Sequence, residues 1–200
     1  MAAVLAGWRK ARFSMAAVLG TMLTLAVSGE EPQRAQVEEA RKATADLVAQ
    51  IRSELLKAIE TSGPLRAIVV CRYTVPEISS AVSRKYGARV TRVSLRPRNP
   101  ALGWADAWEQ SALLSFEQRV AKGEKPDGME HTEIVTEPSG RFFRYARALP
   151  LAPICLHCHG PVDQISEAIR SQLANDYPHD RAIGTAVGQV RGAVIFKKPL

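Results

Sequence analysis

The chain has few cysteines and few aromatic residues: 3 Cys among 200 residues, with aromatic residues at 6%. Three cysteines are too few for a small domain held together by disulfides. Paired carboxylates, a glycine-rich phosphate loop and a Ser/His/Asp arrangement are also lacking, so the sequence supports neither hydrolase nor nucleotide chemistry. Hydrophobic residues make up 46% of the chain, which is enough for a packed core and excludes a fully disordered chain. The length fits one domain with an additional helix.

The first 28 residues have the pattern of a secretory signal peptide. Residues 1–12 hold three basic side chains and no acidic one, residues 13–27 form a mostly apolar run, and the small residues of Ala26-Val27-Ser28 suit a signal peptidase. The run is short for a membrane span, which needs about 20 residues, but an uncleaved N-terminal membrane anchor is the alternative. Removing residues 1–28 lowers the net charge from +7 by three, to +4. Since clustered basic residues with interleaved aromatics are also lacking, we expect no nucleic-acid binding.

Residues 29–62 are predicted to form a long N-terminal helix. Small or apolar side chains recur there every three or four positions, at Val37, Ala40, Thr44, Leu47, Ile51, Leu55 and Ala58. Such a narrow stripe is typical of a helix that packs by one face. The stripe either lies on the domain of the same chain or pairs two copies into a homodimer.

Residues 63–200 are expected to form one α+β domain. Residues 65–71 are apolar and fit either a strand or the start of a second helix. The remaining pattern predicts antiparallel strands with helices on one side. Helices are expected at 76–85, 104–120 and 165–174, strands at 88–95, 131–136, 141–149 and 188–197, and loops at 96–103 and 122–128.

The sequence Cys155-Leu156-His157-Cys158-His159 matches C-x-x-C-H, the attachment motif of c-type haem. In such a motif the two thiols bond to the vinyl groups of the porphyrin and the following histidine becomes the proximal iron ligand. We therefore expect one covalently bound haem c on Cys155 and Cys158, with His159 on the iron. This attachment is completed outside the cytoplasm, which agrees with the export signal and predicts a periplasmic location. Half of a zinc site or a redox-active dithiol are the alternatives, but neither a second paired motif nor a preceding βαβ unit supports them.

The sixth iron ligand stays open on the residues alone. Met129 is the choice of an electron carrier, whereas His157 lies inside the motif, on the wrong side of the ring. Cys71 is an unpaired thiol with apolar neighbours, which is usually a buried, inert side chain. The candidates are Cys71, Met129, His131, His157 and His179, and those for the haem propionates are Arg96, Arg98, Arg141 and Arg144.

Four segments, in order, carry a family resemblance. They are Ala67–Cys71 with Pro76; Arg92–Leu95 with Arg98-Asn99-Pro100 and Trp108-Glu109; the haem motif with Gly160; and Tyr177-Pro178 with Asp180 and Val190–Ala193. Residues 53–200 thereby resemble a family of exported, single-haem c-type proteins with a PAS-like fold, which also occur as extracytoplasmic sensor parts of signalling chains. The resemblance implies a PAS-like antiparallel sheet flanked by helices, with His159 and Cys71 as axial ligands. The chain departs from the family at residues 101–104, which are one residue longer, and at Thr185, where an aromatic is usual.

These expectations lead to a haem-based redox or gas sensor in which Cys71 leaves the iron on reduction and opens a site for CO or NO. It would act on an unidentified redox or signalling partner protein. A periplasmic electron-transfer cytochrome c is the alternative. A haem enzyme would need an open distal site with a general base, for which the sequence offers only ambiguous histidines.

Overall fold

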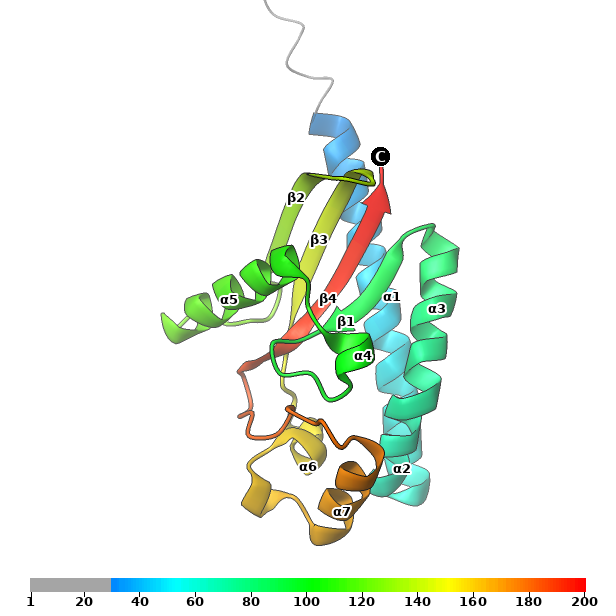
Figure 1. The fold of residues 1–200 in the computed structure, drawn as a ribbon, viewed down its shortest axis with the longest axis vertical. Coiled ribbons are helices and arrows are strands. Elements are labelled where there is room, and N and C mark those ends of the chain that lie inside the picture. The colour runs from blue at the N-terminus through cyan, green and yellow to red at the C-terminus, as the bar shows by residue number, and fades with distance from the viewer. Residues whose placement is uncertain (1–29) are drawn as a thin grey trace, which may run out of the picture.

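The computed structural model describes residues 30–200, so the predicted signal peptide over residues 1–28 and the alternative membrane anchor lie outside the described residues. Helix α1 (Glu30–Ser62) runs along the whole length of the molecule (Figure 1). This confirms the long N-terminal helix predicted from the stripe of small and apolar residues. Within the described part of the chain, no helix combines the length and apolar character that a bilayer crossing requires.

The centre of the fold is a four-stranded antiparallel sheet with the strand order β1-β4-β3-β2. The strands are β1 (Arg89–Val93), β2 (Glu130–Glu137), β3 (Gly140–Pro150) and β4 (Val190–Pro199). The last strand therefore lies in the middle of the sheet, between β1 and β3. The predicted α+β fold, an antiparallel sheet flanked by helices, is confirmed; its PAS-like character stays a prediction.

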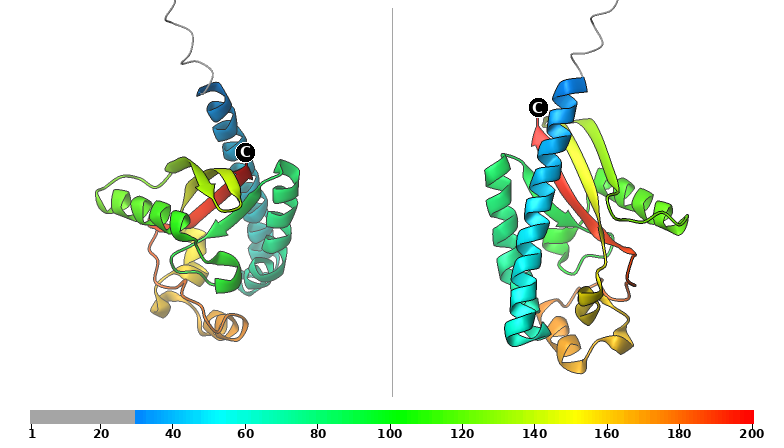
Figure 2. Two further views of the ribbon diagram at one scale, coloured as in Figure 1. Left: turned by 45° about the horizontal axis from the view of Figure 1, so that its top comes forward. Right: turned by 180° about the vertical axis from the view of Figure 1, so that it is seen from behind.

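Helices α1 and α3 (Val75–Tyr86) cover one face of the sheet (Figure 2). The stripe on α1 faces this layer: Ala40, Leu47 and Ile51 are buried in one cluster with Phe143 and Phe196 of the sheet. The sequence left two roles open for the stripe, packing on the same chain or pairing two copies. In the structure, the stripe packs on the domain of the same chain. A homodimer through α1 would have to use the faces that this packing leaves exposed.

Helix α5 (Ala107–Ala121) covers the opposite face, so the expectation of helices on one side only is wrong. The reason lies in β4, where the consecutive residues 193–196 are all buried. Phe196 and Val194 face α1, while Ile195 and Ala193 pack in a second cluster with Phe116 of α5. A strand that is buried on both faces needs a helix layer on each side.

The end of α5 nearest the sheet is set by a capping box, in which Asp106 and Glu109 each bind the backbone N–H of the other residue. The helix therefore starts at Ala107 and not at Trp104 as expected. Its other anchor is Arg144 of β3, whose guanidinium is buried and forms ion pairs with Asp106, Glu109 and Glu137. This network fixes α5 on the sheet.

Short helices gather at the end of the sheet where β3 stops and β4 begins (Figure 1). A third apolar cluster there joins Ile68 of α2 (Pro64–Val69) to Ile169 and Leu173 of α7 (Glu167–Asp176), with Cys158 packed against it. The other segments of this region are the π-helix η1 (Val70–Thr74), α4 (Pro100–Gly103), the 3-10 helix η2 (Pro153–Cys155), α6 (Leu156–His159) and the 3-10 helix η3 (Val162–Gln164). Residues 65–71 are thus helical, and residues 100–103 form a short helix inside the predicted loop 96–103.

A close approach of backbones fixes β4 against β1. A Cβ atom on Gly192 would lie 2.4 Å from the carbonyl oxygen of Val93, which no side chain tolerates without moving the strand. Replacing Gly192 by Ala should therefore cost about 1–3 kcal/mol of folding free energy, as overpacking does. Urea denaturation of the purified protein measures this as a lower midpoint.

The matched control is Gly103→Ala, where the added Cβ would meet only the Pro97 side chain at an ordinary 3.4 Å. This variant should be as stable as the parent or slightly more so, because alanine has less freedom than glycine in the unfolded chain. Equal midpoints for the two variants would contradict the assignment of Gly192 as a contact that only glycine allows.

Candidate functional site

The C-x-x-C-H motif forms a single helical turn. Cys155 ends η2, and Cys158 and His159 lie in α6 three and four residues further on. Residues at this spacing share one face of a helix, so both thiols and the imidazole belong to the same side of the turn. Gly160 closes the turn with a hydrogen bond from its N–H to the carbonyl of Leu156 at 3.0 Å. A Cβ there would lie 2.8 Å from that same oxygen, so the turn requires glycine after the motif.

The imidazole of His159 is oriented through Nδ1, which lies 2.8 Å from the carbonyl oxygen of Ala182. A carbonyl only accepts, so this contact is a hydrogen bond when the proton of the neutral ring is on Nδ1. Burial, followed by the charge of Arg191, lowers the pKa of His159 well below its ordinary value, and the ring is neutral at pH 7. A neutral ring with its proton on Nδ1 has a lone pair on Nε2, which is the form that binds a metal.

The segment that supplies Ala182 is itself tied to the motif. Gly184 and Thr185 donate their N–H groups to the carbonyls of Gly160 and His159, both at 2.9 Å. Asp180 accepts from the N–H of Ala182 at 2.7 Å and forms a buried ion pair with Arg98 at 3.0 Å. Thr185 is itself buried. Two backbone segments, residues 159–160 and 184–185, are thus hydrogen-bonded to each other beside the imidazole of His159.

Arg98 connects this segment to the motif turn, since its Nη2 donates to the carbonyl of Cys158. Burial raises the pKa of the Cys158 thiol, and the charge of Arg98 only partly offsets that effect. Cys158 is therefore protonated at pH 7. Of the four arginines predicted as candidates for a haem, only Arg98 contacts the motif through a hydrogen bond.

Arg191, at the start of β4, also reaches His159: its Nε lies 3.1 Å from His159 Nδ1. Its Nη1 donates to Ser94 Oγ at 2.8 Å and to the carbonyl of Arg96 at 3.1 Å. Burial and three neighbouring guanidinium groups lower the pKa of Arg191 to about 10. Sequence reasoning gave Arg191 no role, although the segment Val190–Ala193 belongs to the family resemblance.

Cys71 lies in the π-helix η1, in the middle of a continuous helical stretch over residues 64–86. Pro76 explains the π-turn, because it has no N–H for the carbonyl of Arg72 and its ring would crowd that oxygen. The turn widens instead, and the N–H of Val75 bonds to the carbonyl of Val70 five residues back. Such π-turns are rare and are frequent at functional sites.

The fold brings Cys71 near the motif although 84 residues separate it from Cys155. Cys71 lies close enough to Cys158 and Tyr177 to interact with both electrostatically: burial, followed by Cys71, raises the pKa of Tyr177 to about 12. Ile68, one helical turn before Cys71, packs in the same cluster as Cys158. The next residue, Arg72, forms an ion pair with Asp176 at the end of α7.

The other candidate ligands lie elsewhere. Met129 is buried in the cluster between the sheet and α5, which contains no residue of the motif. His131 is exposed on β2 and its ring lies 5.3 Å from that of Trp108. His157 and His179 are exposed, and His179 lines a small surface pocket with Arg98 and Tyr177. No group of three or more His, Cys, Asp or Glu side chains is arranged for a metal ion within residues 30–200.

The remaining arginines are engaged away from the motif or exposed. Arg144 is buried in the network under α5, and Arg141 lies exposed at the start of β3. Arg96 pairs with Glu117 at 3.2 Å, while its backbone carbonyl receives Arg191. Arg98 and Arg191 therefore contact the motif, whereas Arg141 and Arg144 lie away from it.

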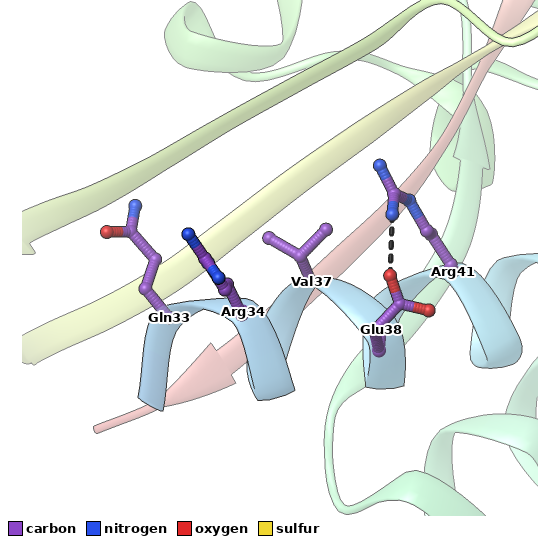
Figure 3. A pocket seen from close by; sticks show the side chains of 5 residues that line it. All are labelled: Gln33, Arg34, Val37, Glu38 and Arg41. Atoms are coloured by element: carbon purple, nitrogen blue, oxygen red, sulfur yellow. Dashed lines mark hydrogen bonds and ion pairs between the residues drawn. The ribbon is translucent and has the colours of Figure 1, made fainter. Parts of the chain in front are cut away.

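A second hollow lies on the first turns of α1, lined by Gln33, Arg34, Val37, Glu38 and Arg41 (Figure 3). Arg41 binds Glu38 at 2.6 Å and Glu130 of β2 at 2.8 Å. Tyr145 also donates to Glu130, at 2.7 Å. None of the residues predicted to take part in haem chemistry lines this hollow, so it is separate from the motif.

Comparison with known proteins identifies one family. The model of the Tll0287-like family (Tll0287) matches residues 30–199. The crystal structure of the cyanobacterial haem protein Tll0287 is similar, with a TM-score of 0.58 and 24% sequence identity over 86% of this chain and 96% of that chain; the likeness shows a shared fold. No curated protein matches significantly. Because the family model covers most of its length, the chain belongs to the Tll0287-like family.

Proposed function

We propose that the protein is an exported c-type cytochrome with one haem, bound covalently by Cys155 and Cys158 and ligated at the iron by His159. The observation that carries this proposal is the motif turn, with two thiols and an imidazole on one helical face and with His159 Nδ1 directed at the carbonyl of Ala182. This donor set fits a c-type haem. The description of Tll0287 as a haem protein supports it.

Each neighbouring residue has a role in this proposal. The carbonyl of Ala182 orients His159 and keeps its proton on Nδ1. Arg98 fixes the motif turn through the carbonyl of Cys158. The cluster around Ile68, Ile169 and Leu173 excludes water from one side of the turn. When bound, the haem would supply an iron that changes oxidation state.

Cys71 is the proposed sixth ligand. Its support is the π-turn created by Pro76, its electrostatic proximity to Cys158 and Tyr177, and the Arg72–Asp176 ion pair that holds the turn against α7. A thiolate donates charge and favours the ferric state, so the reduction potential should be low. Cys71 would hold the iron as a thiolate, and once a partner protein has reduced the iron it would take up a proton at Sγ and leave as a neutral thiol.

The release of Cys71 makes the domain a redox-gated sensor for a small ligand such as CO or NO. The turn that carries Cys71 is continuous with α2 and α3, and both of these helices contact α1. A shift of the turn is therefore passed to the long helix, which reaches the far end of the molecule and can act on a signalling partner. An electron-transfer cytochrome would instead keep its ligands in both oxidation states.

Covalent attachment is tested on protein made in a host that matures c-type cytochromes. The polypeptide mass should rise by that of one haem, and the red colour should stay with the protein after acid–acetone extraction. Replacing both Cys155 and Cys158 by Ala should abolish the bound colour, while the matched variant Cys71→Ala should retain it. Complete extraction of the colour from the parent protein would overturn the proposal.

The sixth ligand is tested by the ferric absorption spectrum. Cys71→Ala should remove the near-infrared charge-transfer band that thiolate ligation produces, and the reduction potential should rise because the donating charge is lost. Met129→Leu is the control, since it removes the alternative sulfur ligand at nearly constant volume. An unchanged spectrum for Cys71→Ala, or loss of the band in Met129→Leu, would exclude Cys71 as the ligand.

Sensing and electron transfer differ in their response to CO. Carbon monoxide added to the dithionite-reduced protein should shift the Soret band, because protonated Cys71 has left the iron, whereas the ferric protein should not respond. If the reduced parent protein keeps its low-spin spectrum under CO, the sensor proposal fails and the electron carrier remains.

A further inference from the structure

Arg191 is held rigidly by one end of its guanidinium group. Nη1 makes two hydrogen bonds, to Ser94 Oγ and to the carbonyl of Arg96. Ser94 Oγ donates in turn to the carbonyl of Arg191 at 2.9 Å. Gly192 allows β4 to approach β1 closely at this point. The backbone and one end of the side chain are thus fixed, and the edge formed by Nε and Nη2 remains on the side of His159.

Two groups compete for the same atom of His159. Nδ1 lies 2.8 Å from the carbonyl of Ala182 and 3.1 Å from Arg191 Nε. When Nδ1 carries the proton, it can donate to the carbonyl of Ala182 but cannot accept from Arg191. When Nδ1 carries no proton, it can accept from Arg191 but cannot donate to the carbonyl. An iron-bound His159 needs the proton on Nδ1. Arg191 Nε then loses its acceptor and requires another one, because a buried N–H group of a guanidinium without an acceptor is costly.

The surroundings of Arg191 hold an excess of positive charge. Arg92, Arg96 and Arg98 all act on it electrostatically. Of the acidic groups there, Asp180 is engaged by Arg98 and Glu117 by Arg96. The partner that this cluster lacks is therefore an anion, and a planar guanidinium edge binds a carboxylate with two parallel hydrogen bonds.

We infer that Arg191 is the binding residue for a haem propionate, which its Nε and Nη2 edge receives when His159 takes the iron. This inference rests on the proposed function, since the haem supplies the carboxylate. Haem loading would thereby exchange one partner of Arg191 for another: the His159 ring donates its Nδ1–H to the carbonyl of Ala182, and the propionate replaces the ring as the acceptor for Arg191. The surplus positive charge of the arginine cluster is lowered by one in the same step.

The test compares the haem-loaded parent protein with Arg191→Gln and Arg191→Lys, with Arg141→Gln as the control for loss of an exposed arginine remote from the motif. Resonance Raman spectra report the propionate deformation band, and redox titration gives the midpoint potential. Arg191→Gln should shift the band and lower the potential, because an uncompensated carboxylate favours the ferric iron. Arg191→Lys should also shift the band, since lysine cannot bind a carboxylate with two parallel hydrogen bonds. Because lysine keeps the positive charge, its midpoint potential should fall less than that of Arg191→Gln. Arg141→Gln should change neither.

An unmoved band and potential in Arg191→Gln would overturn the inference while leaving the cytochrome intact. The inference would also be overturned if Arg191→Gln lost ligation of the iron by His159 while the propionate band stayed unchanged. Arg191 would then act by orienting the His159 ring and not by binding a propionate. If Arg191→Gln does not fold, the band of Arg191→Lys decides in the same way. Absence of covalent haem from the parent protein would instead overturn the proposed function, and the inference with it.

Discussion

The hydrogen bond between His159 Nδ1 and the carbonyl of Ala182 is the contact on which the site depends. A histidine in a short helical turn has two nitrogens that compete for the same proton, and only one tautomer leaves Nε2 free for a metal. The protein sets the tautomer with a backbone carbonyl, which can never donate. That carbonyl is fixed by Asp180 and by the backbone pairing of residues 184 and 185 with the motif. The consequence falls on Arg191, whose Nε contacts the same nitrogen. When Nδ1 carries the proton, it cannot accept a hydrogen bond from Arg191.

Part of this site could be predicted from the sequence, because it depends only on residues that are close together in the chain. C-x-x-C-H needs only five consecutive residues, and its conformation follows from one helical turn closed by Gly160. The Ala182 carbonyl could not be found in this way, because every residue has a carbonyl and only the fold selects one. Arg191 was missed for a related reason: its segment was expected only as an ordinary strand, and its role depends on contacts with Ser94 and Arg96, about a hundred residues earlier. Cys71 was a candidate from the residues, and the resemblance to the family singled it out.

The same division between local and long-range information holds for the fold. The stripe on α1 predicted a packed helix, and the strands expected at 131–136 and 141–149 are found as β2 and β3, because both patterns act between near neighbours. The second helix layer was missed, although the consecutive apolar residues 193–196 of β4 already indicate a strand that is covered on both faces. Pro76 was read as the start of a helix, and α3 does begin there. The stretch before it is helical too, so the effect of the proline is a π-turn at Cys71 instead of a boundary.

That π-turn suits the proposed role of Cys71 as an iron ligand that leaves on reduction. Cys71 sits between buried anchors, with Ile68 and Val70 before it and Val75 after it. A π-turn carries an additional residue, so its backbone can readjust without breaking the hydrogen bonds of the α-helices on either side. The Arg72–Asp176 ion pair holds the turn from outside, and with Arg72 39% exposed at its side chain it contributes little, about 1 kcal/mol or less. If Cys71 ligates the iron as proposed, movement of the sulfur would be opposed mainly by its bond to iron. A weakening of that bond on reduction would then be sufficient to move the turn, and the helices beside it would carry the displacement to α1.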